Sequence, residues 1–273
     1  MKKSELLTHA AALREQSKFR EAYDAFLSAA DKTDNVLEKS AILLDVVTNL
    51  TMLGDYDASR SQLKVIKEML LGLDPKRLTR TDQNEFLRVL VGIDVEHAEI
   101  LAAEGNIEGA IEKLAATIEN FRLQLDDPEF IRIYDDLQCR RAYFLADIDL
   151  FNKAIPILEE VENRHDDDSI FLFYLGQCYF RAKLLDKAQR KLERAINLAT
   201  RQGIAFQAHA ILGMVLYEVG DYARAKKELE TGASLATPQY IKDAKIWKWL
   251  EYTCRKLGLR DEARQYALLA NPS

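Results

Sequence analysis

The sequence of 273 residues has little of what a chemically active site is usually built from. Its cysteines, Cys139, Cys178 and Cys254, lie far apart without Cys-x-x-Cys spacing, which argues against a disulfide framework or a zinc site. The four histidines are scattered, and the chain lacks the glycine-rich, Walker, Gly-x-Ser-x-Gly and His-Glu-x-x-His motifs. We therefore expect no enzyme activity, no cofactor and no bound metal.

Glycine and proline are also scarce, with 11 and 5 residues, so long loops and linkers are not expected. Runs of Val, Ile and Thr are rare, whereas Ala, Leu, Glu, Lys and Arg dominate, and this composition favours helices. No stretch approaches the ~18 uninterrupted apolar residues of a membrane span. The basic start at residues 1–9 lacks the apolar core of a signal peptide. The sequence thus predicts a helical protein of the cytoplasm that does not enter a membrane.

A short phrase recurs along the chain about seven times. Gly-Asp-Tyr is written at 54–56 and again at 220–222, and related phrases precede a small residue elsewhere. Apolar residues between these phrases follow a 3.6-residue period. We interpret each phrase as a tight turn between two antiparallel helices, with a small anchor residue that lets the helices approach closely. The anchors are Ala22, Ser59, Ala110, Ala154, Ala188, Ala225 and Ala263.

Glycine and polar residues around each turn predict where the helices end and begin. The left-handed conformation that ends a helix suits Gly54, Gly105, Gly220 and Gly258. N-caps of the following helices are expected at Asp57, Asn152, Asp186 and Asp261. The acidic stretch at 166–168 has the residue types of a metal site but lacks the spacing and the glycine of an EF-hand. We expect Asp167 or Asp168 to cap a helix there instead.

The residues between the turns resemble the tetratricopeptide repeat. Leu175, Gly176 and Tyr179, followed by Ala188 and Ala195, match its 34-residue signature. The resemblance implies an all-α, right-handed superhelical solenoid of about seven antiparallel helix pairs, forming one domain over 1–273. Earlier units replace the signature glycine by Val47, Ala98 and Ala142, and Glu251 stands there in the last one. The units are expected at about 3–34, 36–71, 82–125, 128–165, 169–202, 204–237 and 240–270.

The function implied by the resemblance is a non-catalytic scaffold or adaptor whose first helices line a concave groove for a peptide or helical segment. The aromatic and arginine side chains expected in the C-terminal half of this groove predict an apolar partner with acidic character. The alternative is that long first helices and tight curvature bury these aromatic residues within the array. The expected groove residues are Arg140, Tyr143, Phe173, Tyr174, Gln177, Phe180, Arg181, Met214, Tyr217, Trp249 and Tyr252.

Two other functions stay open from the residues: a chaperone for secreted or assembling subunits, and a regulator whose array closes on a small peptide signal. The clamp of Lys and Asn by which one chaperone-binding subclass of the family holds a carboxylate is absent at the matching positions. A chaperone-tail adaptor is therefore not expected.

Charge is divided unevenly along the chain. Residues 1–180 contain 21 Lys and Arg against 34 Asp and Glu, and residues 181–273 contain 17 against 10. Within the basic third, one stripe at helical spacing consists of Lys187, Arg190, Lys191 and Arg194. It is either a solvated helix face or a site for an acidic protein partner, including a second copy of the chain. The pI of about 5.4 and the lack of a reading motif make nucleic acid the least expected partner.

Overall fold

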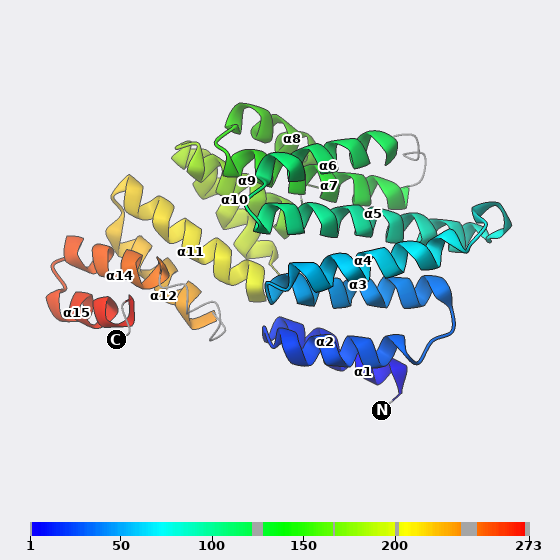
Figure 1. Ribbon diagram of the computed structural model, residues 1–273. Coiled ribbons are helices and arrows are strands. Elements are labelled where there is room, and N and C mark those ends of the chain that lie inside the picture. The colour runs from blue at the N-terminus through cyan, green and yellow to red at the C-terminus, as the bar shows by residue number, and fades with distance from the viewer. Residues whose placement is uncertain (1, 122–127, 166, 200–201, 236–244, 271–273) are drawn as a thin grey trace. The chain divides into compact units, whose positions relative to one another are not determined.

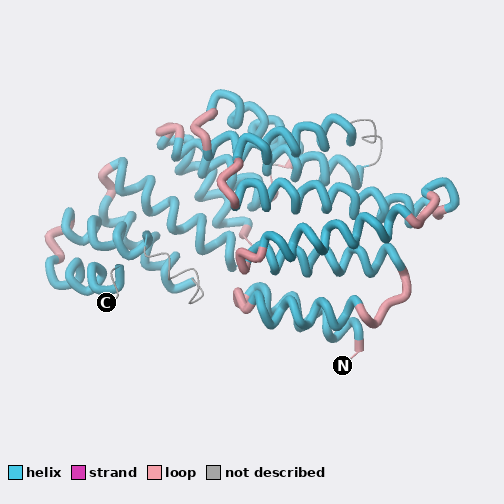
Figure 2. The backbone as a smooth tube through the Cα atoms, in the orientation of Figure 1, coloured by secondary structure: helices cyan, strands magenta, loops and turns pink. Residues whose placement is uncertain are grey.

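The computed structural model describes residues 2–121, 128–165, 167–199, 202–235 and 245–270. Within these ranges the chain forms helices joined by turns and short loops, and no strand occurs in them (Figure 2). The expected all-α class is confirmed. Asp166 and the expected unit ends at 122–125, 200–201 and 236–244 lie outside the described residues.

The helices fall into two compact units, residues 1–137 and 138–273, and the boundary lies within α7 (Pro128–Asp147). Unit 1 contains three helix pairs (Figure 1). A short 3-10 helix, η1 (Pro75–Arg77), precedes the third pair. The pairs are α1 (Lys3–Glu15) with α2 (Phe19–Ala30), α3 (Val36–Met52) with α4 (Tyr56–Leu71), and α5 (Arg80–Ala103) with α6 (Ile107–Phe121).

Unit 2 continues the pattern of helix pairs. After α7 comes α8 (Phe151–Arg164), which packs against the next pair. That pair and the two after it are α9 (Ser169–Arg181) with α10 (Leu185–Leu198), α11 (Gln202–Val219) with α12 (Tyr222–Leu235), and α14 (Lys245–Lys256) with α15 (Arg260–Ala270). The chain is thus an all-α helical repeat, and its assembly into one right-handed superhelix stays a prediction.

Seven turns between the two helices of a pair share one backbone geometry. In each, the residue five positions before the anchor has a positive φ. The amide of the following residue donates to a carbonyl five residues earlier, as from Asp221 N to Leu216 O at 2.9 Å. This Schellman arrangement satisfies carbonyl groups that a helix end would otherwise leave without a donor. The left-handed residues are Ser17, Gly54, Gly105, Asp149, Lys183, Gly220 and Gly258.

The N-caps after these turns lie earlier than expected. The prediction of Asp57 is wrong, because α4 begins at Tyr56 and Asp55 accepts a hydrogen bond from Ala58 N at 3.2 Å. Asn152, Asp186 and Asp261 likewise lie inside their helices. The Schellman bond turns the chain within one residue of the left-handed position, so the second helix starts without a spacer. At α9 the expected cap is confirmed, since Asp168 accepts from Ile170 N at 2.8 Å.

Close approach of the paired helices depends on small residues on both sides. All seven anchors are buried, with at most 5% of their surface exposed. A Cβ atom placed on Gly176 would lie 2.8 Å from Leu192 Cγ, and one on Gly213 would lie 2.5 Å from Leu229 Cγ. The leucine of the second helix therefore fills the space that the signature glycine leaves.

Residues that replace the signature glycine are accommodated in the core. Val47, Ala98 and Ala142 are completely buried. Glu251 is also nearly buried, and its carboxylate pairs with Arg255 Nη2 at 2.5 Å. The ion pair supplies the partner that a buried carboxylate needs, so the last pair keeps the fold without a small residue at this position.

The turn geometry predicts that Gly220→Ala lowers the free energy of unfolding by about 1 kcal/mol or more, because φ is +94° and a Cβ is disfavoured there. No atom lies within 4 Å of the added Cβ, so the effect is purely conformational. Urea unfolding followed by circular dichroism measures it. Gly72→Ala is the matched control, since Gly72 ends α4 with φ −75° and should tolerate the change. Equal stability of the two variants would contradict the turn assignment.

Candidate peptide-binding face of unit 2

The expected groove residues on α7 and α9 pack against one another. The rings of Tyr143 and Tyr174 meet edge to face, with centroids 5.8 Å apart. Together with Gln177 and Arg181 they enclose a space of about 10 Å³, which is room for roughly one water molecule. Arg181 is itself held by Asp147, with Nη1 and Oδ1 2.5 Å apart. This part of the expected groove is therefore closed.

Phe173 does not lie on the surface. Only 3% of it is exposed, and its ring packs against Tyr174 at a centroid distance of 5.6 Å. We expected Phe173 and Phe180 to form one open stripe. This is wrong for Phe173, because the surrounding structure covers that face of α9. Phe180 is half-buried and lies 5.6 Å from Lys183 Nζ, and Arg140 is half-buried on α7.

The expected groove residues on α11 and α14 form an aromatic cluster that is half-buried at Tyr217 and Trp249 and exposed at Tyr252. Tyr217 of α11 meets Trp249 of α14 edge to face at 5.2 Å, and Trp249 meets Tyr252 at 6.4 Å. Tyr252 is 45% exposed, and Met214 is half-buried on α11. The apolar residues Ile246, Leu250 and Cys254 of α14 turn into the core, which leaves the aromatic side chains on the outer stripe of that helix.

Four cations surround this aromatic cluster on α14. All four side chains are exposed. Their spacing along the helix places them on the same outer side as Trp249 and Tyr252. Against them α14 carries one carboxylate, the buried Glu251. Lys256 Nζ lies 5.9 Å from the ring of Tyr222, a cation–π distance. We call this surface the basic-aromatic face, and it consists of Tyr217, Trp249, Tyr252, Lys245, Lys248, Arg255 and Lys256.

The basic stripe expected on α10 is largely neutralised by α8. Lys187 Nζ lies 3.4 Å from Glu159 Oε1, and Arg194 Nη1 lies 3.7 Å from Glu162 Oε1. Lys191 also pairs with Glu162. Arg190 is exposed beside them. This pairing favours the interpretation as a solvated helix face held to its neighbour, rather than as a site for an acidic partner.

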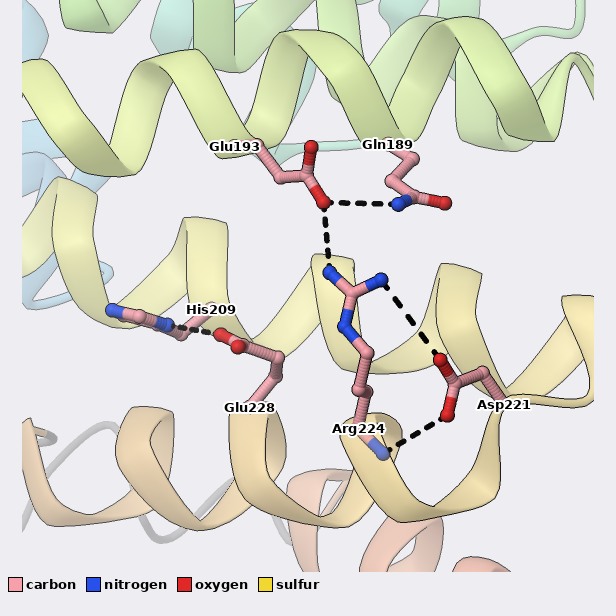
Figure 3. Close-up of polar contacts among 6 residues, drawn as sticks. All are labelled: Gln189, Glu193, His209, Asp221, Arg224 and Glu228. Carbon is pink, nitrogen blue, oxygen red and sulfur yellow. Dashed lines mark hydrogen bonds and ion pairs between the residues drawn. The ribbon is translucent and has the colours of Figure 1, made fainter.

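The same pattern repeats one pair further along (Figure 3). Glu193 of α10 has the same position after its anchor as Glu159 of α8 has after the anchor of that helix. Arg224 of α12 likewise has the same position before its anchor as Lys187 of α10. Arg224 Nη2 lies 2.9 Å from Glu193 Oε1, which also accepts a hydrogen bond from Gln189 at 2.9 Å. Each exposed pair contributes about 0–1 kcal/mol. The second helices of unit 2 are therefore linked by charge pairs in repeat register, and their outer charges are largely satisfied.

No group of three or more His, Cys, Asp or Glu residues is placed in the described part of the chain to hold a metal ion. None of the described helices is long and apolar enough to cross a membrane. The α14 cations were not singled out in the sequence, although their spacing around two aromatic residues is the signal that would have found them.

Comparison with known proteins shows the fold. No protein-family model and no curated protein matches the chain. The chain is similar to the APC/C hetero-tetramer Cut9–Hcn1, with 17% identity over 97% of this chain and 46% of that one and a TM-score of 0.68. The chain is also similar to a STAND protein with a tetratricopeptide repeat sensor from Pyrococcus horikoshii. The two share 15% identity over 98% of this chain and 41% of that one, with a TM-score of 0.65. A third similar structure is NprR in complex with its cognate peptide NprX. It shares 15% identity over 98% of this chain and 76% of that one, with a TM-score of 0.57.

The closed packing between α7 and α9 predicts that Cys178, which lines that space, resists thiol reagents in the native protein. Burial raises the pKa of its thiol to about 11, so little reactive thiolate exists near neutral pH. Labelling at about pH 8 followed by peptide mapping should show Cys178 modified only after unfolding. Modification of native Cys178 at the rate of the unfolded chain would show that the groove opens there.

Proposed function

Because the chain has the fold of the tetratricopeptide-repeat proteins, we propose that it is a non-catalytic scaffold that binds a segment of another protein on the basic-aromatic face of unit 2. The observation that carries the proposal is the contact series Tyr217–Trp249–Tyr252, which runs from two half-buried rings to the exposed ring of Tyr252 and is flanked by exposed cations. Aromatic side chains and arginine are the residue types that dominate binding energy at protein interfaces. Large aromatic groups left at the surface beside charges are typical of a binding face.

The charge of this face defines the partner. Lys245, Lys248, Arg255 and Lys256 outnumber the single carboxylate of α14, and that carboxylate is nearly buried. A peptide with acidic residues or a free carboxylate end would pair with the lysines, and its apolar side chains would pack on Trp249 and Tyr252. We therefore infer a partner segment that is both apolar and acidic.

Two of the similar structures are complexes with a protein or peptide partner, which agrees with this class of function. NprR binds the peptide NprX, and Cut9 assembles with Hcn1. These likenesses concern the fold, so they support a protein or peptide partner by analogy and do not identify one. A peptide-sensing regulator is the narrower function that the likeness to NprR favours. A chaperone for assembling subunits would instead use the same face for one longer partner.

Variants of the exposed residues test the proposal. The probe is a short fluorescent peptide that alternates Leu with Glu and ends in a free carboxylate, and its anisotropy reports binding. Tyr252→Ser and Lys248→Glu should each weaken binding roughly tenfold, since a central aromatic or charged contact is worth about 1–2 kcal/mol. Both side chains are exposed, so the melting temperature should stay nearly unchanged.

The matched control is Arg264→Glu on α15, where the side chain is 82% exposed. It makes the same change in net charge as Lys248→Glu but lies outside the basic-aromatic face. It should leave binding within about twofold of the unchanged protein. If Arg264→Glu weakens binding as much as Lys248→Glu, the peptide responds to net charge alone and the proposed face is wrong.

A further inference from the structure

Unit 1 contains a groove of about 520 Å³ that the sequence did not indicate. It lies between α1, α3 and the first turns of α5. Leu7, Ala11, Ala41 and the ring of Phe26 supply apolar surface to it. Its volume falls in the range of sites that hold a ligand or several side chains of a bound segment.

The unusual length of α5 builds one wall of this groove. α5 has 24 residues, compared with 13 in α1 and 17 in α3, and the additional turns lie at its N-terminal end. Thr79 caps that end by accepting a hydrogen bond from Asp82 N at 3.2 Å. The capped first turns carry Asp82 and Glu85 along the groove. The wall therefore arises from the length of this one helix and is not shared by the shorter first helices α1 and α3.

Negative charge dominates the lining. Its one cation, Arg14, is paired with Asp45 and lies over the ring of Phe26 at 5.3 Å. Of the other carboxylates, Glu38 pairs with Lys3 at 2.5 Å, and this hydrogen bond lowers the pKa of Glu38. Glu85 is half-buried, and its carboxylate has no hydrogen-bond or ion-pair partner among the described residues. A half-buried carboxylate without a partner gains most from a cation supplied by a ligand.

We propose that this groove docks a Lys- or Arg-containing segment of another protein, with apolar side chains of that segment on the Leu7 and Ala11 surface and its cations against Asp82 and Glu85. The charge preference is opposite to that of the basic-aromatic face. Unit 1 as a whole has the matching sign, with 17 Lys and Arg against 26 Asp and Glu. The proposal goes beyond the function proposed for unit 2 and does not depend on it, because no residue is shared.

Binding of a labelled basic peptide tests the proposal. The probe alternates Lys with Leu and Ser, and a matched peptide carries Glu in place of Lys. The full chain should bind the Lys peptide through this groove, more weakly as salt rises. Asp82→Asn with Glu85→Gln should weaken that binding about fivefold or more, because two charged contacts are lost. These changes keep side-chain shape, so folding should persist, and a melting curve checks it.

The matched control is Glu112→Gln with Glu119→Gln on α6, which changes net charge equally at two exposed positions outside the groove. It should leave binding of the Lys peptide unchanged. Equal weakening by both double variants would overturn the proposal, as would Lys peptide affinity no greater than that of the Glu peptide. Self-association of the chain that is lost in Asp82→Asn with Glu85→Gln would also overturn it, by making a second copy the occupant.

Discussion

The left-handed turn five residues before each small anchor is the constraint on which the rest of the molecule depends. It ends the first helix with a Schellman hydrogen bond, such as that from Asp55 N to Leu50 O at 3.0 Å. It then starts the second helix at once, so the anchor always lies at the same height in the pair. Because the anchors are small and buried, the two backbones approach closely, and a leucine such as Leu192 fits over Gly176. Equivalent positions in successive pairs of unit 2 therefore meet equivalent neighbours, since Leu229 also fits over Gly213.

This repetition explains which surfaces are left for partners. The second helices of unit 2 carry acidic and basic residues at fixed positions relative to their anchors. An acidic residue of one helix pairs with a basic residue of the next, as Glu193 pairs with Arg224. Most of the charges on those faces are paired within the chain, although each exposed pair adds only about 0–1 kcal/mol of stability and Arg190 stays exposed. The pattern stops at the last pair, where Glu262 stands at the position of Arg224 and pairs with Lys226 at 2.9 Å. The cations of α14 lie on a first helix instead, outside this register, and so remain beside the exposed ring of Tyr252.

The sequence predicted what is local and missed what depends on distant neighbours. Glycine at turns and alanine at anchors act within one pair, so the helix pairs and the turns at Gly54 and Gly220 could be read directly. The cap at Asp57 was wrong because the tight Schellman turn leaves no spacer, a detail of backbone geometry. Phe173 was expected at the surface because its own helix leaves it opposite the core, but the surrounding structure covers it. The groove beside Glu85 was missed because residues of four helices line it and because it needs the extra length of α5.

On the function proposed above, an acidic, apolar segment contacts Trp249 on the basic-aromatic face. The most direct measurement uses Trp247→Phe, which leaves Trp249 as the single tryptophan. Trp247 stacks on Tyr266 with ring planes 14° apart, so a smaller aromatic ring can replace it. The emission of Trp249 is followed while a Leu–Glu peptide is added. We expect a saturable change in the emission of Trp249 with this peptide and none with its Lys counterpart. Unchanged emission while the labelled Leu–Glu peptide binds, or an equal change with the Lys peptide, would contradict the proposed contact.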